Sequence, residues 1–136
     1  MQPLVAVIDA DPAVQQTLRA LLSALNAKVE FHDNAETYLR RKGVAPACIV
    51  MDAHLPGMTG LELLRQLRTT EIDANRNVPV ILLADEPDVP LAVEAMRLGA
   101  VDFIEKSRMD VALLRRVSQL LHNGGASAAQ KNTVRR

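Results

Sequence analysis

Five short apolar segments alternate with five stretches of helical spacing, and this alternation restricts the fold more than any other feature of the sequence. The apolar segments are LVAVI (4–8), KVEFH (28–32), ACIVM (47–51), VPVILLA (78–84) and VDFIE (101–105). Three of them carry almost no polar residue, as expected of parallel strands that helices cover on both faces. Strands that alternate with helices through short connections predict an α/β fold, with one doubly wound, five-stranded parallel sheet and five helices.

The stretches between these segments repeat large apolar residues at intervals of three and four, which places them on one helical face. These residues are Val14, Leu18, Leu21, Leu22 and Leu25; a weaker set of Ala35, Tyr38 and Leu39; Leu61, Leu64 and Leu67; Val89, Val93 and Met96; and Leu113, Leu114, Val117, Leu120 and Leu121. Asp11 followed by Pro12 predicts one helix start. A capping-box sequence from Thr59 predicts another, and Gly99 predicts the end of the fourth helix.

The composition excludes several classes of protein. Lys plus Arg and Asp plus Glu both number 16, so no net charge attracts the chain to nucleic acid or to a membrane surface. The apolar runs are too short to span a bilayer, and the N-terminus lacks the features of a signal peptide, so we expect a cytoplasmic protein. The single cysteine, Cys48, lies within an apolar segment and is expected to be a core residue rather than a reactive thiol.

The length of 136 residues is enough for one domain with a hydrophobic core. The helical pattern ends at His122. The segment that follows, NGGASAAQKNTVRR, has Val134 as its one large apolar side chain. We therefore expect a domain over residues 1–122 and a flexible linker or tail over residues 123–136.

Residues that suit phosphoryl chemistry follow three of the expected strands. Asp9 ends the first strand, Asp52 ends the third and Lys106 follows the fifth. Because functional groups gather at the carboxyl ends of parallel strands, we expect these three side chains to converge at one edge of the sheet. Two carboxylates suit a divalent cation, and an ammonium group suits phosphoryl oxygens.

The sequence resembles the receiver domains of bacterial two-component response regulators, and most closely those of the FixJ-like branch, over about residues 4 to 121. The segments that carry the resemblance are VIDADPAV (7–14), IVMDAHLPGMTGLELL (49–64) and DVPLAVEAMRLGAVDFIEK (88–106). The resemblance implies the receiver type of the flavodoxin-like fold. It also implies a signalling function without turnover of an external substrate.

The same resemblance implies roles for individual residues. Asp52 matches the aspartate that accepts a phosphoryl group from a sensor histidine kinase, and Lys106 would contact the phosphoryl oxygens. Asp9 and Asp52, together with the backbone carbonyl of His54, would hold Mg²⁺. Asp11 is a further candidate ligand, although we favour its role as a helix N-cap.

Phe103 matches an aromatic switch on the face formed by the fourth helix and the fifth strand. In FixJ-like receivers that face forms a homodimer after phosphorylation, and a helix-turn-helix output domain follows the receiver. We therefore expect control of transcription through an output domain after the linker. We expect no nucleic-acid or membrane binding by this chain itself.

Three positions depart from the pattern of the family. Ala10 replaces the second acid of the metal-binding pair, so we expect weak Mg²⁺ binding. Ala84 replaces the Thr or Ser whose hydroxyl couples the phosphoryl group to the switch. Ser107 replaces a proline that is usually cis, and we expect a trans bond because a cis bond before a non-proline residue costs about 2.5–4 kcal/mol. The acidic segment DEPD (85–88) is also expected near the site.

Two alternative functions remain open. A pseudo-receiver would act as a protein–protein interaction module without phosphorylation, and Ala10, Ala84 and Ser107 favour it. The motif DAD also resembles that of haloacid-dehalogenase-type phosphatases. That match is poorer, because Ala13 stands where those enzymes have Thr or Val and no late acidic pair follows the lysine.

Overall fold

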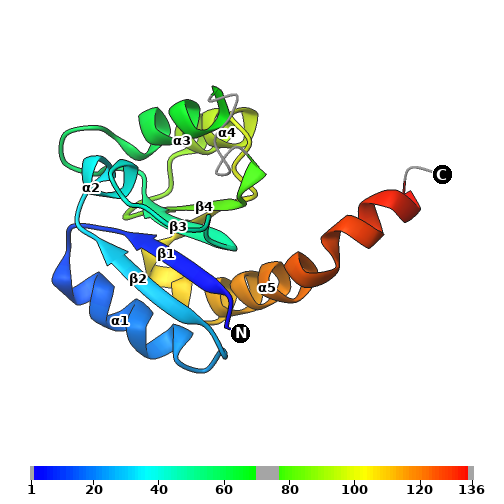
Figure 1. The fold of residues 1–136 in the computed structure, drawn as a ribbon. Helices are drawn as coiled ribbons and strands as arrows, with labels where there is room; N and C mark the ends of the chain where they lie inside the picture. The colour runs from blue at the N-terminus through cyan, green and yellow to red at the C-terminus, as the bar shows by residue number, and fades with distance from the viewer. Residues whose placement is uncertain (1, 70–76, 135–136) are drawn as a thin grey trace.

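The computed structural model describes residues 2–69 and 77–134 and contains strands and helices in alternation. They are β1 (Leu4–Ile8), α1 (Pro12–Leu22), β2 (Lys28–His32), α2 (Ala35–Leu39), β3 (Cys48–Asp52), α3 (Gly60–Thr69), β4 (Val80–Ala84), α4 (Val89–Arg97), β5 (Asp102–Glu105), a 3₁₀ turn (Lys106–Arg108) and α5 (Met109–Val134). The strands form one parallel sheet in the order β2-β1-β3-β4-β5. Helices α1 and α5 cover one face, and α2, α3 and α4 cover the other (Figure 1). The predicted doubly wound fold is confirmed.

Burial of the sheet on both faces explains why the central strands are apolar throughout. Along β1, Ala6 and Ile8 pack into the cluster under α2, α3 and α4, while Val5 and Val7 pack into the cluster under α1 and α5. Cys48 is buried in the second cluster, and burial raises the pKa of its thiol to about 12. A thiol with that pKa is not a nucleophile at neutral pH, as expected of a core cysteine.

The predicted helix boundaries occur where the sequence signals place them. The Asp11 carboxylate accepts a hydrogen bond from the Ala13 amide at the start of α1. The Thr59 hydroxyl accepts from the Glu62 amide at 3.2 Å, and the Glu62 carboxylate accepts from the Thr59 amide at 2.8 Å, which is a complete capping box. Gly99 follows α4 with φ of +97°, a backbone conformation that favours glycine.

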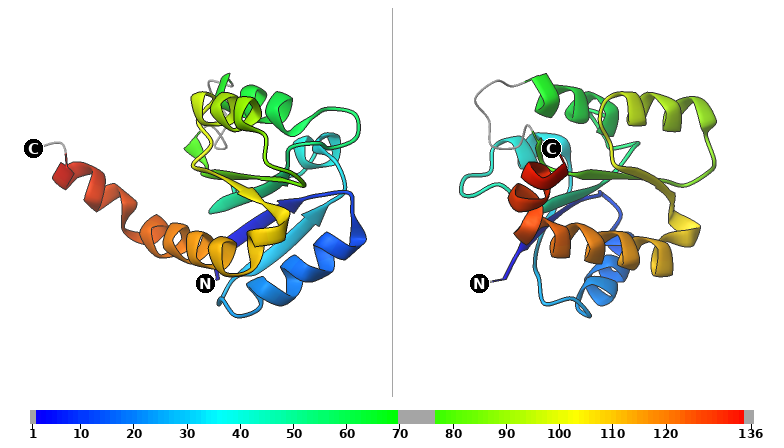
Figure 2. Two further views of the ribbon diagram at one scale, coloured as in Figure 1. Left: turned by 180° about the vertical axis from the view of Figure 1, so that it is seen from behind. Right: turned by 90° about the vertical axis from the view of Figure 1, so that its right-hand side faces the viewer.

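Helix α5 extends further than the apolar pattern predicts. It continues past His122 to Val134, and its last part projects away from the sheet (Figures 1 and 2). A helical backbone is held by its own hydrogen bonds, so the end of the apolar stripe does not by itself end the helix. The flexible linker over residues 123–136 remains a prediction, and positions 135 and 136 lie outside the described residues. None of the described helices is long and apolar enough to cross a membrane.

Candidate functional site

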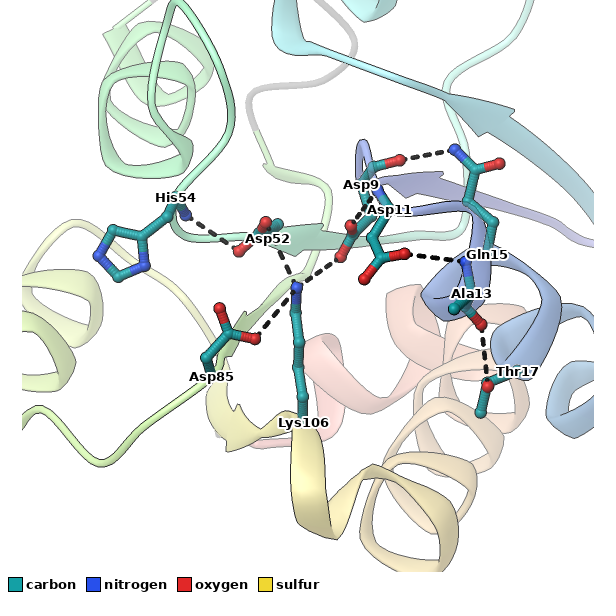
Figure 3. Close-up of polar contacts among 9 residues, drawn as sticks. All are labelled: Asp9, Asp11, Ala13, Gln15, Thr17, Asp52, His54, Asp85 and Lys106. Carbon is teal, nitrogen blue, oxygen red and sulfur yellow. Dashed lines mark hydrogen bonds and ion pairs between the residues drawn. The ribbon is translucent and has the colours of Figure 1, made fainter.

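Three polar side chains from three strand ends meet at the carboxyl edge of the sheet. Lys106 Nζ lies 3.0 Å from Asp9 Oδ2 and 3.4 Å from Asp52 Oδ2 (Figure 3). The side chain of Asp9 is 1% exposed and that of Lys106 is 12% exposed. The parallel order β1-β3-β4-β5 explains this convergence, because all these strands end at the same edge.

In Asp9 and in Asp52, one carboxylate oxygen accepts a hydrogen bond from the turn that follows the strand. The Asp11 amide donates to Asp9 Oδ1 at 2.9 Å, and the His54 amide donates to Asp52 Oδ1 at 3.0 Å. Each bond spans two residues, which is the pattern of an Asx-turn. The turns leave the two Oδ2 atoms facing Lys106, so one ammonium group lies between two carboxylates.

Burial and charge act in opposite directions on this cluster. Burial raises the pKa of Asp9 above its ordinary value, although the Asp11 amide and the contact with Lys106 lower it in part. Burial lowers the pKa of Lys106, but its contact with Asp9 and the charges of Asp52 and Asp85 outweigh burial and raise that pKa overall. Asp9 Oδ2 forms the ion pair with Lys106, yet it accepts no hydrogen bond of good geometry from the described residues.

The segment after β4 surrounds the opening of the site with acidic groups. Asp85 Oδ1 lies 3.8 Å from Lys106 Nζ, and the Asp85 side chain is 77% exposed. A depression of about 370 Å³ is lined by His54, Asp85, Glu86, Pro87 and Asp88. The acidic segment DEPD therefore lies beside the cluster.

Asp11 and Ala10 do not join the buried cluster. Asp11 is exposed, and its Oδ1 accepts from the Ala13 amide at 2.9 Å. Ala10 is exposed in the turn between β1 and α1. Within residues 2–69 and 77–134, no group of three or more His, Cys, Asp or Glu side chains is arranged to hold a metal ion. A cation at this edge would thus have the carboxylates of Asp9 and Asp52, with backbone oxygens and water.

The other two departures have different surroundings. Ala84 is buried at the end of β4, in register with Glu105 of β5. Ser107 is exposed in the 3₁₀ turn, and every peptide bond of the described residues is trans, as predicted for the Lys106–Ser107 bond. Lys106 reaches Asp9 and Asp52 from this trans turn, so a cis bond is not needed to place its ammonium group.

Phe103 lies on β5, half-buried, beside a surface groove. It packs against the cluster under α2, α3 and α4, and it lines a cavity of about 430 Å³ together with Val89 and Ala92 of α4. The apolar stripe of α4 points outward from the same region, with Val89 72%, Val93 50% and Met96 49% exposed. The stripe predicts the helix correctly, but it does not mark the buried face of that helix.

Sequence reasoning missed one polar residue of the site. Gln15 of α1 donates through Nε2 to the backbone carbonyl of Asp9 at 2.6 Å (Figure 3). Side chains in the first turn of a helix lean back toward its N-terminus, and here that end adjoins the strand that carries Asp9, so every polar residue of this turn is a candidate. Nothing in the residue type or spacing of Gln15 distinguishes it from its neighbour Gln16.

Comparisons with known proteins show what this chain is similar to. The family model described as response regulator receiver domain matches residues 5–118. The chain is 42% identical to the transcriptional regulatory protein FixJ of Azorhizobium caulinodans over 128 residues, which is 93% of this chain and 57% of that protein. It is 35% identical to FixJ of Bradyrhizobium diazoefficiens over 123 residues, 90% of this chain and 58% of that protein.

A solved structure shows the same likeness. The crystal structure of FixJ-N matches with a TM-score of 0.71 and 35% identity over 90% of this chain and 95% of that one. This chain therefore spans nearly all of FixJ-N, but only about three fifths of the full-length FixJ proteins.

Proposed function

Because this chain belongs to the family of response regulator receiver domains, with FixJ among its relatives, we propose that Asp52 accepts a phosphoryl group from a sensor histidine kinase. The observation that carries the proposal is the position of Lys106 between the Oδ2 atoms of Asp9 and Asp52. An ammonium group that is only 12% exposed stabilises the charge of phosphoryl oxygens there, because little water screens it. Phosphorylation of Asp52 would then control a transcriptional output domain.

Magnesium fits the residues that are present. Asp9 Oδ2 is a buried carboxylate oxygen without a hydrogen bond from the described residues, and Mg²⁺ commonly uses one or two carboxylates together with phosphoryl oxygens and waters. Asp9, Asp52 and the backbone carbonyl of His54 would hold the ion, which when bound offsets the charge of the phosphoryl group. Without a carboxylate at Ala10 the binding is expected to be weak.

In the proposed step, a carboxylate oxygen of Asp52 attacks the phosphorus of a phosphohistidine. An O–P bond forms and the N–P bond breaks; the phosphohistidine ring carries a proton on its other nitrogen, so it leaves as neutral imidazole and an acyl phosphate remains on Asp52. Asp52 Oδ1 is engaged by the His54 amide, which fixes the carboxylate plane, while Oδ2 faces Lys106. Lys106 holds the phosphoryl oxygens through charge-assisted hydrogen bonds, a role that needs no proton transfer.

The experiment is intact mass measurement after treatment with acetyl phosphate, with and without Mg²⁺, beside an Asp52→Asn control. The expected result is one phosphoryl adduct that requires Mg²⁺ and is absent from the control. If neither acetyl phosphate nor a phosphorylated histidine kinase gives an adduct, the proposal is wrong.

The proposed output surface is the α4–β5 face, which would form a homodimer after phosphorylation. It is supported by the exposed stripe of Val89, Val93 and Met96 and by the half-buried Phe103 next to it. Exposed apolar side chains grouped on one helix commonly mark an interaction surface. Sedimentation with and without beryllofluoride and Mg²⁺ tests this, and a monomer under both conditions would exclude the dimer.

A pseudo-receiver is the second candidate, and Ala84 is the observation that favours it. Ala84 is 1% exposed and has no hydroxyl to couple a phosphoryl group to Phe103. In that case the fold would act as an interaction module without phosphorylation. Beryllofluoride binding that requires Mg²⁺ argues for the phosphorylated receiver, and its absence argues for the pseudo-receiver.

A further inference from the structure

We infer that Gln15 is a positioning residue for Asp9, which it clamps to the loop after β2. Its Nε2 donates to the Asp9 carbonyl at 2.6 Å and to Asp33 Oδ1 at 2.9 Å (Figure 3 draws the first of these bonds). One amide group thereby links α1, the end of β1 and the loop that follows β2. The consequence for phosphorylation rests on the proposed function, whereas the clamp itself does not.

The chemistry of the two partners sets the orientation of the Gln15 amide. A backbone carbonyl and a carboxylate only accept hydrogen bonds, and a glutamine NH₂ group has two donors. The opposite orientation would place Oε1 against two acceptors. The bond to Asp33 is also charge-assisted, which makes it stronger than a neutral hydrogen bond.

With the bond from Gln15, both backbone polar groups of Asp9 have hydrogen-bond partners. The Asp9 amide donates to the His32 carbonyl of the neighbouring strand at 3.0 Å, so β2 holds one side and Gln15 holds the other. The Asp11 amide then holds Oδ1, which leaves only Oδ2 to face the site. Each polar group of Asp9 except Oδ2 thus has a defined hydrogen-bond partner.

This support matters because of Ala10. With no carboxylate at that position, Asp9 is the one buried acid that β1 brings to the cluster, and Asp11 is engaged at the start of α1. Mg²⁺ requires near-octahedral geometry, so the one carboxylate that the end of β1 supplies must be held in a fixed orientation to bind it. The Gln15 clamp supplies that constraint.

The test compares Gln15→Met with Gln16→Met. Methionine keeps the length of glutamine but donates no hydrogen bond, and Gln16 is an exposed neighbour on α1 that serves as the matched control. The first readout is hydrogen exchange of the Asp9 and Asp11 amides by NMR in metal-free protein. The second is the Mg²⁺ dissociation constant from a titration followed by amide chemical shifts.

Loss of the clamp is expected to weaken Mg²⁺ binding about two- to twelvefold, since a net hydrogen bond contributes about 0.5–1.5 kcal/mol and about 1.36 kcal/mol is tenfold. Exchange of the Asp11 amide is expected to rise in Gln15→Met and to stay unchanged in Gln16→Met. Gln15→Arg, whose guanidinium has enough donors for both oxygens, should return that exchange to within about twofold of the wild type.

Two results would overturn the inference. The first is that the Asp9 and Asp11 amides exchange hydrogen at the same rate in Gln15→Met as in Gln16→Met. The other is a lower Tm with exchange raised evenly over α1, which shows a general structural role. If the wild type fails to bind Mg²⁺, the metal site of the proposed function is wrong, and the metal-free exchange data still decide whether Gln15 positions Asp9.

Discussion

Replacement of Gly60 should directly disturb the end of β3, the strand that carries the proposed phosphoacceptor Asp52. A Cβ at this position would lie 2.5 Å from the Asp52 carbonyl oxygen, 2.9 Å from Ala53 Cα and 3.1 Å from Leu82 Cδ2. The first two are backbone atoms at the end of β3, so no side-chain rotation relieves the overlap. Gly60→Ala must therefore move either the start of α3 or the backbone of Asp52, the proposed phosphoacceptor.

The magnitude follows from two opposing contributions. Overpacking in a close-packed core costs about 1–3 kcal/mol. Alanine is more favourable than glycine in a helix by up to about 1 kcal/mol, although Gly60 is only the first residue of α3. We therefore expect Gly60→Ala to lower the free energy of unfolding by about 1–2 kcal/mol.

Urea unfolding with a constant m-value measures this change, and Gln16→Ala on the exposed face of α1 is the control, with a change below about 0.5 kcal/mol. Because the overlap involves the Asp52 backbone, the yield of the Mg²⁺-dependent phosphoryl adduct should fall as well. A Gly60→Ala protein as stable as the wild type to within about 0.5 kcal/mol would refute the reasoning from the Cβ contacts.

Three further predictions follow from other contacts. Asp11→Ala should lower the free energy of unfolding by about 1 kcal/mol, whereas Asp11→Asn should retain it, because either side chain caps α1; a weaker Mg²⁺ affinity in Asp11→Asn would instead make Asp11 a ligand. The hydrogen bonds from Arg41 and His32 outweigh burial and lower the pKa of Glu30 below its ordinary 4.5. The ionised Glu30 carboxylate therefore stabilises the fold fully above pH 4.5, and this contribution is lost as the pH falls through the lower pKa of the folded state. In acid unfolding curves, the free energies of unfolding of wild type and Glu30→Gln should thus converge below about pH 4.5. Ala84→Thr should restore a hydroxyl at the end of β4 and strengthen any beryllofluoride-induced dimer, and an unchanged dimerisation constant would show that Phe103 is not coupled to the phosphoryl site.

The sequence determined the fold class because the relevant information is local and repeated. The apolar segments around Val7 and Val50, with helical stripes between them, require a sheet that is covered on both faces. Parallel strands also have their carboxyl ends at the same edge of the sheet, which predicts that Asp9, Asp52 and Lys106 lie close together. The capping residues Asp11 and Thr59 also act through bonds within their own turns, so their effect could be predicted without tertiary contacts.

Only the tertiary structure decided which groups face the site. Gln15 and Gln16 are identical in type and adjacent in sequence, yet only Gln15 bonds to the Asp9 carbonyl, because β1, α1 and the loop after β2 meet there. Likewise, the pattern of α4 predicts a helix, but its packing leaves Val93 exposed. Periodicity reports the conformation of a segment, whereas the neighbours of a side chain depend on elements far apart in the sequence, and the packed fold alone brings these together.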